Sequence, residues 1–221
     1  MSLVLDSGEL WVAATNTYVI APEPGGPAVV VDAPPDVDAI AALLSRHDLV
    51  PVALLLTHGH IDHVGGAGGV VRRTGAAAYL HPDDDFLAAD PVAQLRSIFG
   101  VAPPGAEAFA APDRFEQLSD GQHLRIAGIE FEVRHTPGHT PGHVCFYVED
   151  EGILFSGDQL FAGSIGRTDF PYGDFDALMR SMADKVMTLP DDIEVLPGHG
   201  PVTTIGRERT SNPFILDFLG S

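Results

Sequence analysis

The chain has 221 residues, of which 45% are hydrophobic and 19% are charged, proportions that are ordinary for a soluble globular enzyme. Acidic residues outnumber basic residues by 31 to 12, and a net charge of −19 would repel a phosphate backbone, so we expect no nucleic-acid partner. The sequence has no apolar run of roughly 18 residues and no basic signal-peptide start, so we expect a cytoplasmic protein and no membrane partner.

The first third of the chain predicts two strands, a helix and a third strand. Residues 10–20 and 28–32 have the apolar character of strands, with a Pro-Gly turn between them. Residues 37–47 carry apolar side chains at helical spacing after Asp36, a residue type that caps helix N-termini. The apolar run at 52–56 then predicts a buried strand.

The stretch after this strand is the most informative part of the sequence. Residues 57–63 read Thr-His-Gly-His-Ile-Asp-His. Alternate residues of an extended loop face the same way, so His58 and His60 can reach one ion, and a turn after them directs Asp62 and His63 to a neighbouring point. Imidazole and carboxylate together suit zinc, iron or manganese. A lone histidine is usually a packed residue, but three histidines and an aspartate within six residues predict a metal site.

The next segment predicts short elements and then becomes irregular. Residues 65–73 favour a glycine-rich helix, 76–80 a short strand and 83–89 one or two helical turns. Residues 82–118 as a whole show weak periodicity and many turn residues. We interpret them either as a lid over the site or as an irregular connection.

The second half predicts four strands, a long helix and a last strand. These elements are expected at residues 123–126, 129–135, 143–148, 153–156, 175–188 and 193–196. Three more metal-capable residues follow strands: His139 on a Pro-Gly loop, Asp158 after Gly157, and His199 after Pro-Gly. Neither a repeat nor a linker marks a boundary, so we predict one domain over residues 1–221.

The metal-capable residues occur in four motifs: His-x-His-x-Asp-His at 58–63, Pro-Gly-His at 139, Gly-Asp at 158 and Pro-Gly-His at 199. From about residue 10 to about residue 205, the chain thereby resembles the metallo-β-lactamase superfamily. This resemblance implies an α/β fold, an αβ/βα four-layer sandwich of two mixed β-sheets flanked by helices. Within the superfamily the chain is similar to the glyoxalase II (hydroxyacylglutathione hydrolase) group, especially its short bacterial branch. That likeness lies in residues 135–143, 156–161, 163–169 and 203–214.

The resemblance implies two adjoining divalent metal ions, with zinc expected and iron or manganese as alternatives. It divides the ligands into two sets that share one carboxylate: His58, His60 and His139 on the first ion, Asp62, His63 and His199 on the second, and Asp158 between them. A carboxylate has two oxygens and can span two cations, as this assignment requires.

The implied activity is that of a thioesterase of the hydroxyacylglutathione hydrolase type, acting on a small-molecule thioester. A hydroxide between the metals would attack the thioester carbonyl, and Asp62 would orient it as a catalytic residue. An iron-dependent persulfide dioxygenase resembles the chain at the same ligand positions and is the first alternative. A non-catalytic metal-binding module is the second. A metallo-β-lactamase fits less well, because Asp158 stands where those enzymes commonly use other ligands. The acyl group, the thiol carrier and the oligomeric state do not follow from the sequence.

Two further histidines flank the second ligand motif. His135 and His143 are expected either to position the ligands or simply to be packed residues. Cys145 lies in an apolar strand and is expected in the core rather than as a nucleophile. As the single cysteine it excludes an internal disulfide.

Three arginines follow ligand positions closely and are predicted to bind an anionic thiol carrier: Arg167, Arg207 and Arg209. The alternatives are a structural ion pair between Arg167 and Asp169 and a solvated helix face for the other two. Tyr172 is a further candidate for the substrate pocket. The tail at 205–221 is predicted to pack near the site, in place of the helical substrate domain of longer glyoxalase II enzymes.

Overall fold

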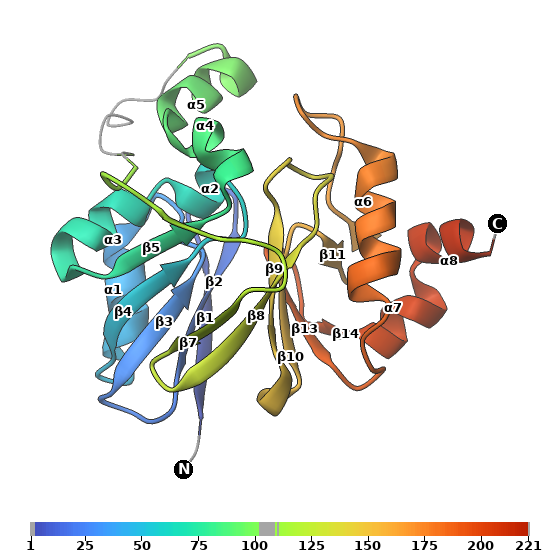
Figure 1. The fold of residues 1–221 in the computed structure, drawn as a ribbon. Helices are drawn as coiled ribbons and strands as arrows, with labels where there is room; N and C mark the ends of the chain where they lie inside the picture. The colour runs from blue at the N-terminus through green and yellow to red at the C-terminus, as the bar shows by residue number, and fades with distance from the viewer. Residues whose placement is uncertain (1–2, 102–108, 110, 221) are drawn as a thin grey trace. The chain divides into compact units, whose positions relative to one another are not determined.

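In the computed structural model, residues 3–101, 109 and 111–220 are described, and they belong to two compact units (Figure 1). The first unit comprises Met1–Leu118 and Arg125–Ile129, and the second comprises Ser119–Leu124 and Glu130–Ser221. The prediction of a single domain over residues 1–221 stays a prediction. Among the described residues no helix has the length and apolar character needed to cross a membrane.

The first unit is built on a six-stranded mixed sheet with the order β1-β2-β3-β4-β5-β6. Its strands are β1 (Val4–Leu10), β2 (Thr15–Ala21), β3 (Pro27–Val31), β4 (Val50–Leu55), β5 (Ala77–Leu80) and β6 (Glu116–Gln117). The first three pair antiparallel and the last four pair parallel. The carboxyl ends of β3 and β4 therefore meet at one edge of the sheet, which is where the first ligand motif begins.

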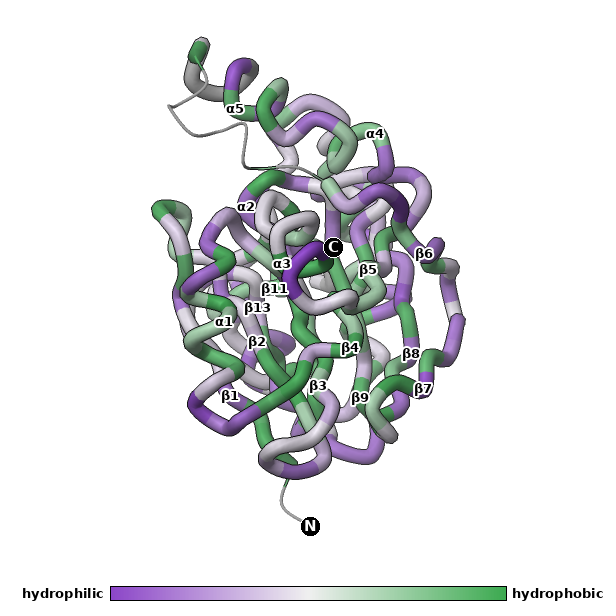
Figure 2. Tube along the Cα trace, turned by 90° about the vertical axis from the view of Figure 1, so that its left-hand side faces the viewer, coloured by the Kyte–Doolittle hydropathy of each residue, from purple (hydrophilic) through white to green (hydrophobic). Residues whose placement is uncertain are grey.

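The helices of this unit are short, and two of them build its core. They are α1 (Val37–Ser45), α2 (Ile61–Val64), α3 (Ala67–Thr74), the 3-10 turn η1 (Pro82–Asp84), α4 (Asp85–Ala88) and α5 (Pro91–Phe99). As expected, Asp36 caps α1 by accepting a hydrogen bond from the Ala39 amide. Ile40 of α1 and Val70 of α3 are buried in one cluster with side chains of β3 and β4, strands that Figure 2 shows as mostly hydrophobic.

The second unit is built on another six-stranded mixed sheet, with the order β14-β13-β10-β9-β8-β7. Its strands are β7 (His123–Ile126), β8 (Ile129–His135), β9 (Val144–Val148), β10 (Ile153–Gly157), β13 (Glu194–Pro197) and β14 (Thr203–Thr204). A small hairpin of β11 (Leu160–Phe161) and β12 (Ser164–Ile165) forms a separate sheet. The neighbouring strands β10 and β13 are parallel, so the turns after both strands lie side by side.

The helical elements of the second unit are η3 (Glu149–Glu151), α6 (Phe175–Ser181), the π-helical turn η4 (Met182–Val186), α7 (Ile205–Ser211) and α8 (Pro213–Leu219). Leu178 and Met182 share a buried cluster with Cys145 of β9 and Val195 of β13, and Ile215 of α8 joins the same cluster. The elements α6, η4, α7 and α8 thus bury apolar side chains in the core of this unit.

Most predicted elements are confirmed within a few residues, but the prediction at 10–20 is wrong in its first part. Residues 11–14 form a turn between β1 and β2, in which Trp11 and Ala14 have positive φ angles of 61° and 53°. Residues 82–118 were expected to form a lid or an irregular connection. Their described residues include three short helical elements and β6. Residues 102–108 and 110 of that segment lie outside them.

Candidate metal centre

The first unit supplies four of the seven predicted ligands from one turn. Thr57 follows β4, and the chain then passes His58 and His60 before entering the short helix α2, which carries Asp62 and His63. The imidazole rings of His58 and His63 are fully buried and their centroids are 4.0 Å apart. The His60 ring stands edge-on to His58 at 4.9 Å. This unit therefore brings the three imidazoles of residues 58–63 close together.

A buried carboxylate on the neighbouring strand end holds this turn. Asp32 follows β3, and its carboxylate accepts hydrogen bonds from the Thr57 amide at 2.8 Å and from His63 Nδ1 at 2.8 Å. The Thr57 hydroxyl lies 2.9 Å from the same carboxylate and 3.0 Å from His58 Nδ1. An ionised carboxylate only accepts, so the hydroxyl donates to Asp32 and accepts from His58. We therefore assign the Nδ1–H tautomer to both histidines, which leaves Nε2 of each as the ligand atom.

Asp32 itself has an unusual backbone. Its φ angle is +59°, in the left-handed region that residues other than glycine seldom occupy, although aspartate tolerates it better than most. Backbone hydrogen bonds from Ala33 to the His63 carbonyl and from Gly66 to the Ala33 carbonyl hold this corner against the ligand turn. The local strain is thus balanced by contacts to the residues that Asp32 positions.

Two polar side chains from later in the chain fix the backbone on either side of His60. The buried carboxylate of Asp84 accepts a hydrogen bond from the Gly59 amide at 2.7 Å. Gln94 of α5 accepts from the Ile61 amide at 3.0 Å and donates to the Gly59 carbonyl at 2.8 Å. The His60 peptide units are therefore held by a carboxylate and a carboxamide.

The predicted acidic ligand of this unit, Asp62, lies close to a predicted histidine ligand, His63. The Asp62 carboxylate is 3.5 Å from His63 Nε2, and its side chain is 22% exposed. With the proton of His63 on Nδ1, both atoms are acceptors and cannot hydrogen-bond to each other. Two acceptors at this distance repel unless a cation or a proton lies near both, so the donor set fits a metal ion.

The second unit supplies the other three predicted ligands from three turns. His139 lies between β8 and β9, Asp158 directly after β10, and His199 after β13. One Asp158 oxygen is 3.4 Å from His139 Nε2, and the other oxygen is 3.8 Å from His199 Nε2. His139 Nδ1 donates to the Arg167 carbonyl at 2.7 Å, so its Nε2 also carries a lone pair. The carboxylate of Asp158 thus directs its two oxygens at two different imidazoles.

The turns around these ligands depend on close backbone approach. A Cβ atom on Gly166 would lie 1.8 Å from the Asp158 carbonyl oxygen, so only glycine fits between the ligand turn and residues 165–167. Gly138 has a φ angle of +140° and lies against the backbone of Leu178 in α6. Since Gly198 also donates to the Gly157 carbonyl, the turns after β10 and β13 are joined directly.

The two flanking histidines have different surroundings. His135 is partly exposed, and its Nε2 donates to the Pro141 carbonyl at 2.9 Å. His143 is fully buried, and its Nε2 accepts from the Asp158 amide at 3.0 Å. His143 therefore contacts the backbone of a predicted ligand, whereas the hydrogen bond of His135 holds the loop that follows His139.

The three arginines predicted to bind substrate also differ. The Arg167 guanidinium forms two hydrogen bonds of 2.7 Å with Asp169 and stacks on Phe170 at 3.7 Å, which is the structural ion pair given above as the alternative. Arg209 donates to the carbonyls of Met187 and Leu189 and pairs with Asp191. Arg207 is exposed, and its guanidinium forms no ion pair within the described part of the chain.

The rest of the predicted substrate wall is exposed rather than enclosed. Tyr172 is 63% exposed and has a φ angle of +74° in the turn before α6. In the tail, Phe214 and Leu216 of α8 are 41% and 47% exposed, while Ile215 is buried in the core of the unit. The contact of Tyr172 and of the tail with a substrate stays a prediction.

Cys145 has no nucleophilic character. The residue is fully buried in β9, as expected from its apolar strand, and burial raises the pKa of its thiol to about 12. The thiolate, which is the reactive form of cysteine, is therefore almost absent at neutral pH.

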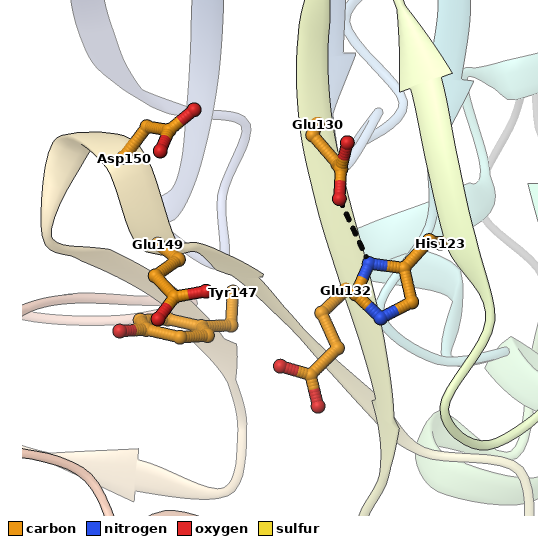
Figure 3. A pocket seen from close by; sticks show the side chains of 6 residues that line it. All are labelled: His123, Glu130, Glu132, Tyr147, Glu149 and Asp150. Atoms are coloured by element: carbon orange, nitrogen blue, oxygen red, sulfur yellow. Dashed lines mark hydrogen bonds and ion pairs between the residues drawn. The ribbon is translucent and has the colours of Figure 1, made fainter.

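A separate pocket of about 230 Å³ (Figure 3) lies beside the start of β8 and the end of β9, whereas the predicted ligand His139 follows the end of β8. It is lined by His123, Glu130, Glu132, Tyr147, Glu149 and Asp150. His123 and Glu130 form a hydrogen bond of 3.0 Å, and both side chains are more than half exposed. A pocket with four carboxylates would repel an anionic substrate, so we do not place the reaction there.

Similarity to known proteins identifies the family of the chain. The family model of the metallo-beta-lactamase superfamily matches residues 10–199. The chain belongs to this superfamily. Hydroxyacylglutathione hydrolase GloC of Haemophilus influenzae is 40% identical over 189 residues, covering 85% of this chain and 87% of that protein.

Two solved structures are also similar to this chain. The BLEG-1 B3 metallo-beta-lactamase superposes with a TM-score of 0.87 at 36% identity, covering 96% of this chain and 99% of that one. TTHA1623 in a di-iron-bound form gives a TM-score of 0.79 at 38% identity, covering 97% of this chain and all of that one. The predicted fold class, two mixed sheets flanked by helices, is therefore confirmed as that of the superfamily.

Three residues that hold the first ligand turn were not singled out in the sequence: Asp32, Asp84 and Gln94. For Asp32 a signal was present, because an acidic residue directly follows a buried strand, as Asp158 does. Asp84 and Gln94 carry no such signal, since they act from short helices 25 and 33 residues from their partners.

Proposed function

We propose that this chain is a thioester hydrolase of the hydroxyacylglutathione hydrolase type that holds two divalent metal ions. The similarity to GloC supports the substrate class, and the superfamily supports metal-dependent hydrolysis. Four of the seven ligands that the resemblance implies lie in the first unit and three lie in the second. Zinc is the proposed metal, and the di-iron form of TTHA1623 makes iron the first alternative.

The observation that carries the proposal is the position of Asp158. A ligand shared by two ions must offer one donor atom to each, and a carboxylate does so when its oxygens face different sites. In the second unit one oxygen of Asp158 faces His139 and the other faces His199. This arrangement is what a bridging ligand between two ions requires.

When bound, a pair of divalent ions lowers the pKa of a shared water and polarises a carbonyl oxygen. The residues contribute orientation: the hydrogen bonds of Asp32 and of the Arg167 carbonyl fix the ring planes and tautomers of His63 and His139. The partly exposed Asp62 carboxylate is placed to accept a hydrogen bond from water. In the overall reaction water adds to the acyl carbon, the C–S bond breaks, and a carboxylic acid and a free thiol are released.

The test is an assay of the purified, metal-quantified protein with S-lactoylglutathione under anaerobic conditions. We expect free thiol and acid to appear in equal amounts, and we expect the activity to disappear after chelator treatment and to return with metal. Glutathione persulfide in an oxygen electrode and a chromogenic β-lactam serve as competing substrates. Oxygen uptake with sulfite formation would contradict the proposal and indicate an iron-dependent persulfide dioxygenase. Preferential cleavage of the β-lactam would indicate a lactamase instead.

A further inference from the structure

A chain of buried polar groups lies directly behind Asp158 in the second unit. It consists of His143, Thr136, Cys145 and the Ser156 carbonyl, and each of these residues has zero exposure. None of the four is among the seven predicted ligands. A buried polar group is costly unless it is hydrogen-bonded, so a run of them at this depth requires an explanation.

The direction of every hydrogen bond in this chain follows from its first member. The Asp158 amide can only donate, and it lies 3.0 Å from His143 Nε2, so Nε2 carries no proton. A neutral imidazole then carries its proton on Nδ1, which lies 2.8 Å from Thr136 Oγ1. The Thr136 oxygen therefore accepts, and its own hydrogen is available to the Cys145 sulfur at 3.4 Å.

The series of hydrogen bonds ends on β10, the strand that Asp158 directly follows. The Cys145 thiol donates to the Ser156 carbonyl at 3.5 Å, and Ser156 lies in β10, two residues before Asp158. Burial raises the pKa of this thiol to about 12, so it keeps the hydrogen that it donates. The ring of side chains thus begins and ends on the peptide units of residues 156–158.

We propose that His143 is a positioning residue that orients Asp158 toward its metal ions through the Asp158 backbone amide. The proposal rests on the proposed function only in taking Asp158 as a metal ligand. Gly157, between the two held peptide units, has a φ angle of +48° and could adopt many other conformations. With the amide fixed, the Asp158 carboxylate keeps one oxygen on the side of His139 and the other on the side of His199.

The geometry assigns different roles to the two histidines of the motif at 139–143. His139 uses Nδ1 on a carbonyl and keeps Nε2 for a metal ion, whereas His143 uses Nε2 on an amide and Nδ1 on a hydroxyl. His143 has neither nitrogen available for an ion. A serine or threonine could accept from an amide, but neither is long enough to reach from position 143 to both Asp158 and Thr136.

The test compares three substitutions at this position. His143→Gln can place an amide oxygen near the position of Nε2, His143→Asn carries the same group one bond short, and His143→Leu has no acceptor. We expect the Leu and Asn variants to bind metal about 10- to 100-fold more weakly than the wild type and to alter the visible spectrum of the cobalt-substituted protein. The Gln variant should retain most of the wild-type affinity and spectrum. Chelator competition gives the affinity. Thr203→Val is the matched control, because it removes a buried hydrogen bond to Glu208 in the same unit without touching a ligand.

Equal metal affinities for the Gln, Asn and Leu variants would overturn the proposal, as would an equal loss in Thr203→Val. If His143→Leu does not fold, the comparison of Gln with Asn decides. Nitrogen-15 NMR provides a readout that needs no metal: we expect the Nδ1–H tautomer for His143 and a slowly exchanging Asp158 amide. An Nε2–H tautomer would overturn the proposal even in the metal-free protein. If the wild-type protein binds no metal but shows the expected tautomer and amide, the proposed function fails and the hydrogen-bond chain stands.

Discussion

The histidine ligands whose second nitrogen has an identified partner are all held through Nδ1. His63 is held by Asp32, His58 by Thr57 and His139 by the Arg167 carbonyl. Holding one nitrogen fixes the ring plane and leaves the other nitrogen as an acceptor, which is how proteins prepare imidazole for a metal ion. The geometry of the site therefore depends on these hydrogen-bond partners as well as on the predicted ligands.

Asp158→Ala should lower metal occupancy at both sites, because Asp158 is the residue proposed to contact both ions. Elemental analysis of the purified wild-type protein should give close to two metal equivalents, and the variant should give fewer than one. Asp158→Asn keeps a single good acceptor and should fall between them. Circular dichroism serves to verify that both variants are folded. A folded Asp158→Ala protein with full metal content would exclude the bridging role.

Asp32→Asn should reduce metal affinity by about 10- to 100-fold, since the amide cannot accept from both Thr57 and His63 as the carboxylate does. Asparagine tolerates a positive φ angle, so the backbone corner should persist. Chelator competition measures the affinity. Asp36→Asn is a matched control, because it removes the same charge at the cap of α1 and should leave metal binding unchanged. An Asp32→Asn protein with wild-type affinity would show that the tautomers are fixed in another way.

The Cys145 thiol should be almost inert in the folded protein. Because burial raises its pKa to about 12, the thiolate fraction rises only as the pH approaches that value and is on the order of one in ten thousand at pH 8. Reaction with a thiol reagent at pH 8 should therefore be slow in the native protein and complete within minutes in denaturant. Rapid stoichiometric labelling of the native protein would show that Cys145 is accessible.

At the scale of elements, the ligand turns depend on helices that are remote in the sequence. Gln94 is the connection from α5 to the first turn, and its carboxamide forms hydrogen bonds with Gly59, Ile61 and Leu87. In the same unit Ile61 and Leu95 share a small buried cluster with Trp11 and Phe109. The helix α5 is thus attached to the first ligand turn by the hydrogen bonds of Gln94 and by the packing of Leu95 against Ile61.

Gln94→Leu should destabilise the first unit and disturb His60 in particular. Three hydrogen bonds at about 1 kcal/mol each predict a loss of about 2 to 3 kcal/mol, or a melting temperature lower by about 5 to 10 °C. Differential scanning calorimetry measures this loss. Gln117→Leu is the matched control, because the Gln117 amide is exposed and its bonds to Asp85 are long, at 3.3 to 3.5 Å. A Gln94 variant as stable as the Gln117 variant would show that α5 does not support the turn.

Elements with a strong period or clear turn residues could be predicted from the sequence. The hairpin of β7 and β8 was predicted to the residue, because alternating side chains surround an Ala-Gly turn at 127–128. The strand β1 was not predicted, since its polar residues 6–9 lie in an edge strand that pairs on one side only. The helix α5 was not predicted, since residues 82–118 show weak periodicity, although Pro91 lies in the first turn of this helix, where proline is favoured.

The site divides in the same way. The ligands could be predicted because they occur in short motifs at strand ends, where local spacing decides what can meet. The residues that hold the ligand turn could not be predicted, because Asp32, Asp84 and Gln94 are 25 to 33 residues from the groups with which they form hydrogen bonds. Only the pairing of β3 with β4 and the placement of α4 and α5 bring these groups to the ligand turn. Such contacts are a property of the tertiary fold, which a single sequence does not display.

At the scale of the whole molecule the dominant property is charge. With 31 acidic and 12 basic residues, the protein should repel an anionic substrate over distances of about a Debye length, about 10 Å at 0.1 M salt. The structure limits the cations that could offset this repulsion. Arg167 is paired with Asp169, and Arg209 is bound to two carbonyls and Asp191. Of the three predicted carrier-binding arginines, Arg207 has the guanidinium that a substrate carboxylate could most easily contact.

This balance predicts how salt should act on turnover. Between about 10 and 200 mM salt, kcat/KM for S-lactoylglutathione should rise by roughly two- to threefold as the repulsion is screened, whereas a neutral thioester should be hardly affected. Arg207→Ala should raise KM for the anionic substrate and steepen its salt dependence, because it removes an exposed opposing charge. Arg209→Ala is the matched control, because it removes the same charge two residues away. The Arg209 guanidinium already binds groups of its own unit, so this substitution should lower stability and leave the salt dependence of kcat/KM unchanged. A kcat/KM that falls with salt for the anionic substrate would mean that a cationic surface, rather than the net charge, governs substrate approach.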